Sequence, residues 1–100
     1  MNDRPEISTN PIPLQAVEGS KQIAGIGYSP ETSTLAIQFK PRAGEAAGSI
    51  YHYGGVAPEV FEQFRAAQSK GNYFYANIRN ETEKYPFVKI ADPVPASEAA

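Results

Sequence analysis

The segment "TLAIQF", residues 34–39, places a large apolar side chain at every second position. Leu35, Ile37 and Phe39 therefore share one face of an extended chain, and smaller or polar residues occupy the other. A period of two residues is typical of a half-buried β-strand. This segment predicts the centre of an antiparallel sheet.

Three further segments predict strands around it. Residues 22–29, "QIAGIGYS", end at a Ser-Pro turn signal and predict a hairpin with residues 34–39. Residues 49–53, "SIYHY", follow a polar, glycine-bearing loop and stop at two glycines. Residues 84–90, "KYPFVKI", predict a last strand, and their proline favours an edge or entry position in the sheet.

Helical spacing lies between the predicted strands at residues 49–53 and 84–90. Pro58 suits the first turn of a helix, where its missing N–H costs nothing. The apolar stripe of this helix is formed by Val60, Phe61, Phe64 and Ala67. A glycine after Lys70 suggests its end, and a second, short helix is expected over residues 72–79, capped by Asn72. Strands followed by helices predict an α+β fold: a three-strand antiparallel meander plus a C-terminal strand, packed with one main and one short helix.

The length of 100 residues allows one domain. Three prolines among the first 19 residues predict an extended N-terminal arm over residues 1–19. Residues 20–91 form the predicted domain, and the small-residue segment 92–100 is expected to be a flexible tail.

Composition restricts the chemistry. The chain has no cysteine and a single histidine, so we expect no disulfide, no metal site and no cofactor. The first residues lack the apolar run of a signal peptide, and no segment approaches the length of a membrane span. We therefore expect a cytoplasmic protein. The net charge of −2 does not indicate a strongly basic nucleic-acid binder, although a local basic face remains open.

The segment "YHY" holds that histidine between two tyrosines. Tyr51 and Tyr53 are two residues apart on a strand and point to the same side, whereas His52 points to the other. No spacing selects a nucleophile or an orienting partner for His52, so we interpret it as a surface strand residue and predict no catalytic residue. For the tyrosine pair two interpretations stay open: a core face with hydroxyls at its rim, or a platform on which bases stack.

A second focus is the segment "SKGNYFY", residues 69–75. No acidic residue lies between Arg65 and Arg79. Cations in this interval would neutralise phosphates, and its aromatic side chains would stack on bases. A solvated helix face above core aromatics is the alternative. The candidate binding residues are Tyr51, Tyr53, Arg65, Lys70, Tyr73, Tyr75 and Arg79.

The motifs "IGY" (26–28), "YHY" (51–53), "VAP" (56–58) and "SKG" (69–71), followed by an aromatic pair and Ile78, resemble the KTSC domain in order and spacing. That family is named for its occurrence at the C-terminus of some lysyl-tRNA synthetases, and it also occurs as small single-domain bacterial and phage proteins. The resemblance therefore implies a protein of the bacterial cytosol, encoded by a bacterium or a phage. The resemblance covers about residues 20–90. Ser29 stands where the family has an acidic residue, and Ala57 splits the usual "VP".

Together these observations predict a small, non-enzymatic binding module. The leading expectation is modest-affinity binding of RNA or single-stranded DNA by the candidate residues. The alternative is a protein-interaction module that docks on a host complex, which the acidic balance and the proline-bearing arm favour. The oligomeric state is left open.

Overall fold

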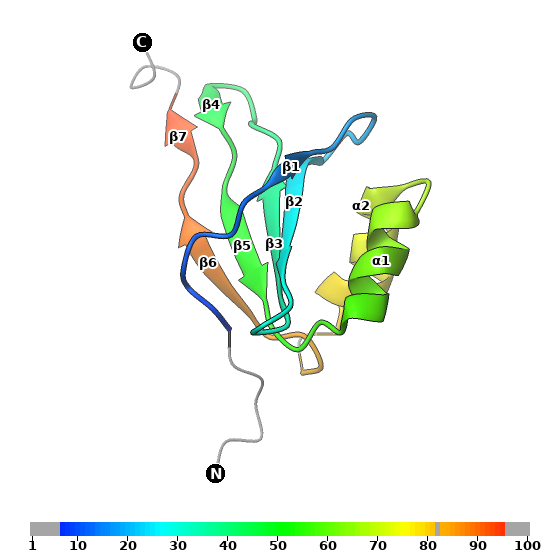
Figure 1. The fold of residues 1–100 in the computed structure, drawn as a ribbon. Helices are drawn as coiled ribbons and strands as arrows, with labels where there is room; N and C mark the ends of the chain where they lie inside the picture. The colour runs from blue at the N-terminus through cyan, green and yellow to red at the C-terminus, as the bar shows by residue number, and fades with distance from the viewer. Residues whose placement is uncertain (1–6, 82, 96–100) are drawn as a thin grey trace.

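The computed structural model describes residues 7–81 and 83–95. Its strands and helices form an α+β fold in which the helices lie together beside one sheet (Figure 1). The strands are β1 (Gln15–Ala16), β2 (Ile23–Ser29), β3 (Thr34–Phe39), β4 (Glu45–Ala47), β5 (Ile50–Tyr53), β6 (Phe87–Ala91) and β7 (Val94–Pro95). The helices are α1 (Pro58–Ala66), α2 (Lys70–Phe74) and the π-helix η1 (Tyr75–Arg79).

The main sheet has the order β1-β2-β3-β5-β6, and every pair is antiparallel. The predicted meander and C-terminal strand are confirmed as β2, β3, β5 and β6. The register sets Ile37 opposite Tyr51, and Tyr51 in turn opposite Lys89. Because directly paired residues share a face, one side of the sheet carries aromatic side chains from three neighbouring strands.

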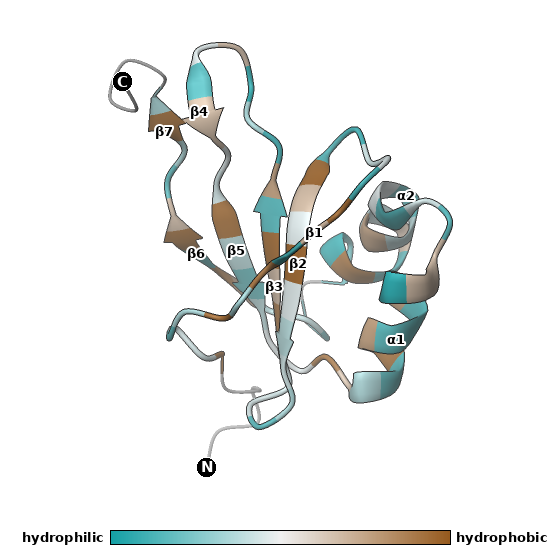
Figure 2. Ribbon diagram, turned by 45° about the horizontal axis from the view of Figure 1, so that its top comes forward, coloured by the Kyte–Doolittle hydropathy of each residue, from teal (hydrophilic) through white to brown (hydrophobic). Residues whose placement is uncertain are grey.

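The core lies between this face and the helices. Leu35, Ile37 and Phe64 are fully buried, and Phe39 and Phe61 pack against them, so the strand face and the helix stripe predicted from the sequence meet in one core. Phe61 of α1 stacks on Tyr28 of β2 with ring centroids 4.8 Å apart. Apolar segments run along β2, β3 and β5, while much of α1 is hydrophilic on its outer side (Figure 2).

The opposite face of the sheet is covered by the arm, which crosses it before forming β1 (Figure 1). Ser8 donates its N–H to Thr34 Oγ1 at 3.1 Å. A Cβ atom on Gly27 would lie 2.1 Å from the carbonyl oxygen of Pro13, so the arm approaches β2 where that strand has no side chain. Residues 1–6 of the predicted arm lie outside the described residues.

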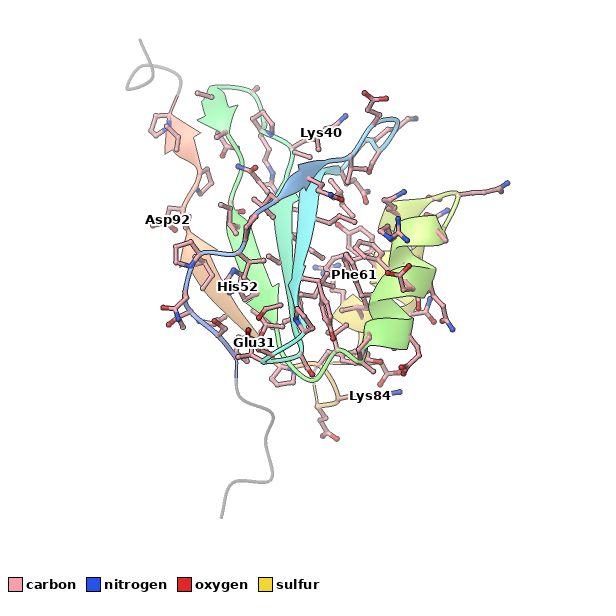
Figure 3. All side chains as sticks on the ribbon, in the orientation of Figure 1. Glu31, Lys40, His52, Phe61, Lys84 and Asp92 are labelled. Atoms are coloured by element: carbon pink, nitrogen blue, oxygen red, sulfur yellow. The ribbon has the colours of Figure 1, made fainter. Side chains whose placement is uncertain are left out.

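His52 is 1% exposed, so its interpretation as a surface residue was wrong. Its Nδ1 atom lies 2.5 Å from the carbonyl oxygen of Ser8. Because a carbonyl only accepts, Nδ1 carries the hydrogen. Strand periodicity placed His52 on the face away from the tyrosines, as observed, but it did not reveal that the arm covers this face (Figure 3).

The second helix also differs from its prediction. It begins at Lys70, and Ser69 rather than Asn72 is its N-cap, accepting the N–H of Asn72 at 3.3 Å. Gly71 lies inside this helix instead of ending the first one. A Cβ atom there would lie 2.8 Å from the side-chain oxygen of Gln22, so the glycine allows the helix to approach the start of β2.

A second, two-stranded sheet pairs β4 with β7 beyond the end of the main sheet (Figure 1). Residues 92–100 were expected to be a flexible tail, yet Val94–Pro95 form β7 against Glu45 and Ala47. Residues 96–100 lie outside the described part of the chain. Among the described helices, none combines the length and apolar character that crossing a membrane requires.

Candidate functional site

A groove of about 580 Å³ lies on the helix-side face of the sheet, lined by residues of β3, β5, β6 and η1 and of the neighbouring loops. Its volume falls in the range of roughly 300–1,000 Å³ that small-ligand sites have. Its aromatic lining consists of Phe39, Tyr51, Tyr53, Tyr75 and Phe87. Its basic lining consists of Lys21, Lys40, Arg42, Arg79 and Lys89.

Three of the aromatic rings form a continuous platform, which we call the Tyr51–Tyr53–Phe87 platform. The ring centroids of Tyr51 and Tyr53 lie 6.5 Å apart, and each lies 5.8 Å from that of Phe87. The platform follows from register, since Tyr53 pairs directly with Phe87 across β5 and β6. Its rings are held by the sheet rather than by loops.

The helices cover this platform only in part. Phe74 of α2 packs edge-on against Tyr53 with centroids 5.3 Å apart, and it also contacts Phe39. Tyr53 is therefore buried, Tyr51 is half-buried, and Phe87 is 51% exposed. The two sequence interpretations of the tyrosine pair are thus not exclusive, because the same side chains border both the core and the groove.

Cations lie over the aromatic rings at two places. The guanidinium of Arg79 lies 4.9 Å from the ring centroid of Tyr75, its neighbour four residues back in η1. The ammonium of Lys89 lies 5.9 Å from the ring centroid of Tyr51 and 3.3 Å from a carboxylate oxygen of Asp92. Contacts between a cation and a ring orient both side chains beside the platform. Lys89 is also paired with the carboxylate of Asp92, whereas the contact of Arg79 with a neutral ring leaves its charge in place.

Burial raises the pKa of the Tyr53 hydroxyl above its usual value, and the neighbouring Tyr51 raises it further. The hydrogen bond to Asp92 raises the pKa of the Lys89 ammonium. At neutral pH the groove therefore presents a neutral tyrosine and a protonated lysine.

Charge is unevenly distributed over the molecule. Five of the nine Lys and Arg residues line the groove, compared with one of the eleven Asp and Glu residues, Glu45. A negative net charge is thus compatible with a basic site. The described residues contain no group of three or more His, Cys, Asp or Glu side chains that could hold a metal ion.

The structure brings four of the seven candidate residues into this groove: Tyr51, Tyr53, Tyr75 and Arg79. The other three lie elsewhere. Arg65 is paired with Glu62 on α1 at 2.5 Å. Tyr73 donates its hydroxyl to Gln63 at 3.1 Å and packs on Phe64. Lys70 lines a second, smaller hollow between α2 and residues 17–22.

The groove also contains residues that sequence reasoning missed. Phe87 and Lys89 alternate with Val88 and so share a face, but their pairing with Tyr51 and Tyr53 spans more than thirty residues of chain. Lys40 and Arg42 directly follow the strand "TLAIQF". By strand alternation both fall on the face opposite Phe39, and β3 ends before them, so the sequence pattern carried no signal for their place in the groove.

Comparison with known proteins finds a domain family and a solved structure to which this chain is similar. The KTSC domain family model matches residues 19–85. A KTSC domain protein of known structure from Yersinia pestis superposes with a TM-score of 0.65 at 33% identity, covering 81% of this chain and all of that one.

Similar sequences occur in two kinds of protein. A lysine–tRNA ligase from Nostoc is 39% identical over 70 residues, which are 70% of this chain and 11% of the ligase. An uncharacterised protein from Stutzerimonas stutzeri is 29% identical over 66 residues, which are 66% of this chain and 84% of that protein. The family match, the superposition and these relatives agree, and this chain belongs to the KTSC domain family.

Proposed function

We propose that this protein is a non-enzymatic module that binds single-stranded nucleic acid, RNA first, in the groove above the Tyr51–Tyr53–Phe87 platform. The observation that carries the proposal is the meeting of five aromatic and five basic side chains in one groove. Aromatic rings stack on bases of any sequence, and cations neutralise the phosphates between them.

One ring of the platform has the exposure that a stacking surface requires. Phe87 is half-exposed although it is a large apolar residue, and it lies on a sheet strand rather than in a loop. An exposed aromatic costs free energy in water, which a stacked base would recover. Base stacking on such rings contributes about 1–3 kcal/mol per base.

A single strand fits this surface better than a duplex does. The bases of a duplex are stacked on one another and are not free to lie on a protein ring. RNA is preferred over DNA in the proposal because one relative is, by its name, a ligase that acts on a tRNA. A non-enzymatic role is supported by the lining itself, in which Glu45 is the one carboxylate and His52 is turned to the opposite face.

Fluorescence anisotropy with labelled single-stranded RNA tests this proposal. Phe87→Ala removes an exposed platform ring and spares the core, so we expect the dissociation constant to rise about five- to hundredfold, equivalent to about 1–3 kcal/mol. Val94→Ala is the matched control, because Val94 is the other exposed large apolar residue of the described chain and does not line the groove.

Equal affinities for wild type and Phe87→Ala would contradict the proposed site. Absence of binding to RNA and DNA single strands at low salt and micromolar protein would overturn the nucleic-acid function. Docking on a protein partner would then be the better account.

A further inference from the structure

Three of the groove's five cations lie together at one end of the sheet. Ile23 pairs with Phe39, so the start of β2 and the end of β3 are neighbours. Lys40 continues this pairing by donating its N–H to the carbonyl of Gln22 at 2.8 Å. The resulting basic cluster, which we call the strand-end cluster, consists of Lys21, Lys40 and Arg42.

The strand-end cluster keeps most of its charge. The ion pairs of the described residues are Arg65–Glu62 and Lys89–Asp92, and neither involves the cluster. Glu45 lines the same end, and its carboxylate accepts the backbone N–H of Arg42 at 2.9 Å. One carboxylate opposes three cations, so a net positive charge of about two faces the groove at this end.

This charge exceeds what an internal phosphodiester, with a single negative charge, neutralises. A terminal phosphate monoester carries about −1.5 to −2 at pH 7 and offers three strong acceptor oxygens. The geometry points to a terminal phosphate as the ligand of the strand-end cluster: the groove takes the phosphorylated end of a single strand. This inference rests on the proposed function and specifies its substrate class.

The rest of the groove is arranged to suit such an end. Phe39 and Tyr51, whose ring centroids lie 5.8 Å apart, come next to the cluster, because they belong to the end of β3 and the paired part of β5. Tyr53, Phe87 and Arg79 follow further along. On the other side of the cluster, β4 and β7 pair beyond the main sheet (Figure 1). A strand that ends at the cluster can thus lay its first bases on the platform and its next phosphate near Arg79.

The test compares three labelled RNA hexamers of one sequence that differ only at their ends: 5′-phosphate, 3′-phosphate, or hydroxyl at both. We expect one phosphorylated hexamer to bind about tenfold more tightly than the hydroxyl form, the ratio that one added charge-assisted hydrogen bond provides. The preferred end reveals the polarity of the bound strand.

Lys40→Gln should reduce this ratio to below about threefold, since it removes one cation of the cluster and leaves the platform intact. Lys84→Gln is the control, because Lys84 is an exposed lysine near the far end of the molecule (Figure 3). Far-UV circular dichroism establishes that both variants are folded.

The outcomes separate this inference from the proposed function. If no hexamer binds, both are overturned. If the hydroxyl hexamer binds as tightly as both phosphorylated forms, the strand binds in the groove but the terminal-phosphate inference is wrong. If Lys40→Gln leaves the ratio of the affinities for the phosphorylated and hydroxyl hexamers unchanged, the terminal phosphate does not bind at the strand-end cluster.

Discussion

The Nδ1 atom of His52 lies 2.5 Å from the carbonyl oxygen of Ser8, a residue 44 positions earlier in the chain. This hydrogen bond fastens the N-terminal arm to the centre of the sheet on the face opposite the groove. The same segment is fastened a second time where Ser8 donates its N–H to Thr34. The arm from Ser8 onward is therefore part of the folded unit.

Removing either attachment should destabilise the protein. His52→Leu keeps most of the side-chain volume and removes the donor, and Thr34→Val removes the acceptor. Each should lower the free energy of unfolding by about 0.5–1.5 kcal/mol, because each removes a hydrogen bond to the half-buried backbone of Ser8. Urea denaturation measures both. Losses below about 0.5 kcal/mol in both variants would contradict the docking of the arm.

Phe64 and Phe87 should behave oppositely under the same substitution. Phe64 is fully buried, so Phe64→Ala should cost about 3–5 kcal/mol of unfolding free energy. Phe87 is half-exposed, and Phe87→Ala should cost less than about 1 kcal/mol. Thermal or urea unfolding of the two variants provides the comparison. A large loss for Phe87→Ala would mean that this ring is a structural residue and not a free part of the platform.

Tyr53 should make the protein sensitive to alkali. Its pKa is raised in the folded state by burial and by Tyr51, so the unfolded chain releases the proton first as the pH rises. The stabilising contribution is complete below the ordinary pKa of tyrosine, about 10, and is lost progressively above it, by up to about 1.4 kcal/mol per pH unit. Tyr53→Phe should remove this loss. Urea unfolding of wild type and Tyr53→Phe between pH 8 and 11 measures this difference. If the free energies of unfolding of the two proteins fell in parallel with pH, Tyr53 would not be the cause of the sensitivity to alkali.

Sequence periodicity predicted much of the fold. The alternation of residues 34–39 and the apolar stripe around Phe64 were sufficient to place the meander, the main helix and the core between them, because both patterns are local. The strands β1, β4 and β7 were missed. They have two or three residues each and arise from contacts between distant segments, for which a single sequence carries no periodic signal.

The candidate site was predicted less completely, for a related reason. The interval from Arg65 to Arg79 is continuous in sequence, but α1 ends within it, and Arg65 pairs with Glu62 on α1. Only its η1 residues, Tyr75 and Arg79, reach the groove. Phe87 lies opposite Tyr53 because of the register between β5 and β6. That register depends on the path of the chain through the helices that separate the two strands in sequence.

The salt dependence of single-stranded RNA binding tests the central proposal most directly. With three or more of the groove's cations contacting phosphates, a plot of log K against log salt should have a slope of about −2 or steeper. Arg79→Gln should flatten it by about 0.7, because Arg79 lies in the groove beside Tyr75. Arg65→Gln, which removes a cation already paired on α1, should leave the slope unchanged. A slope near zero, or equal flattening by both variants, would contradict binding in this groove.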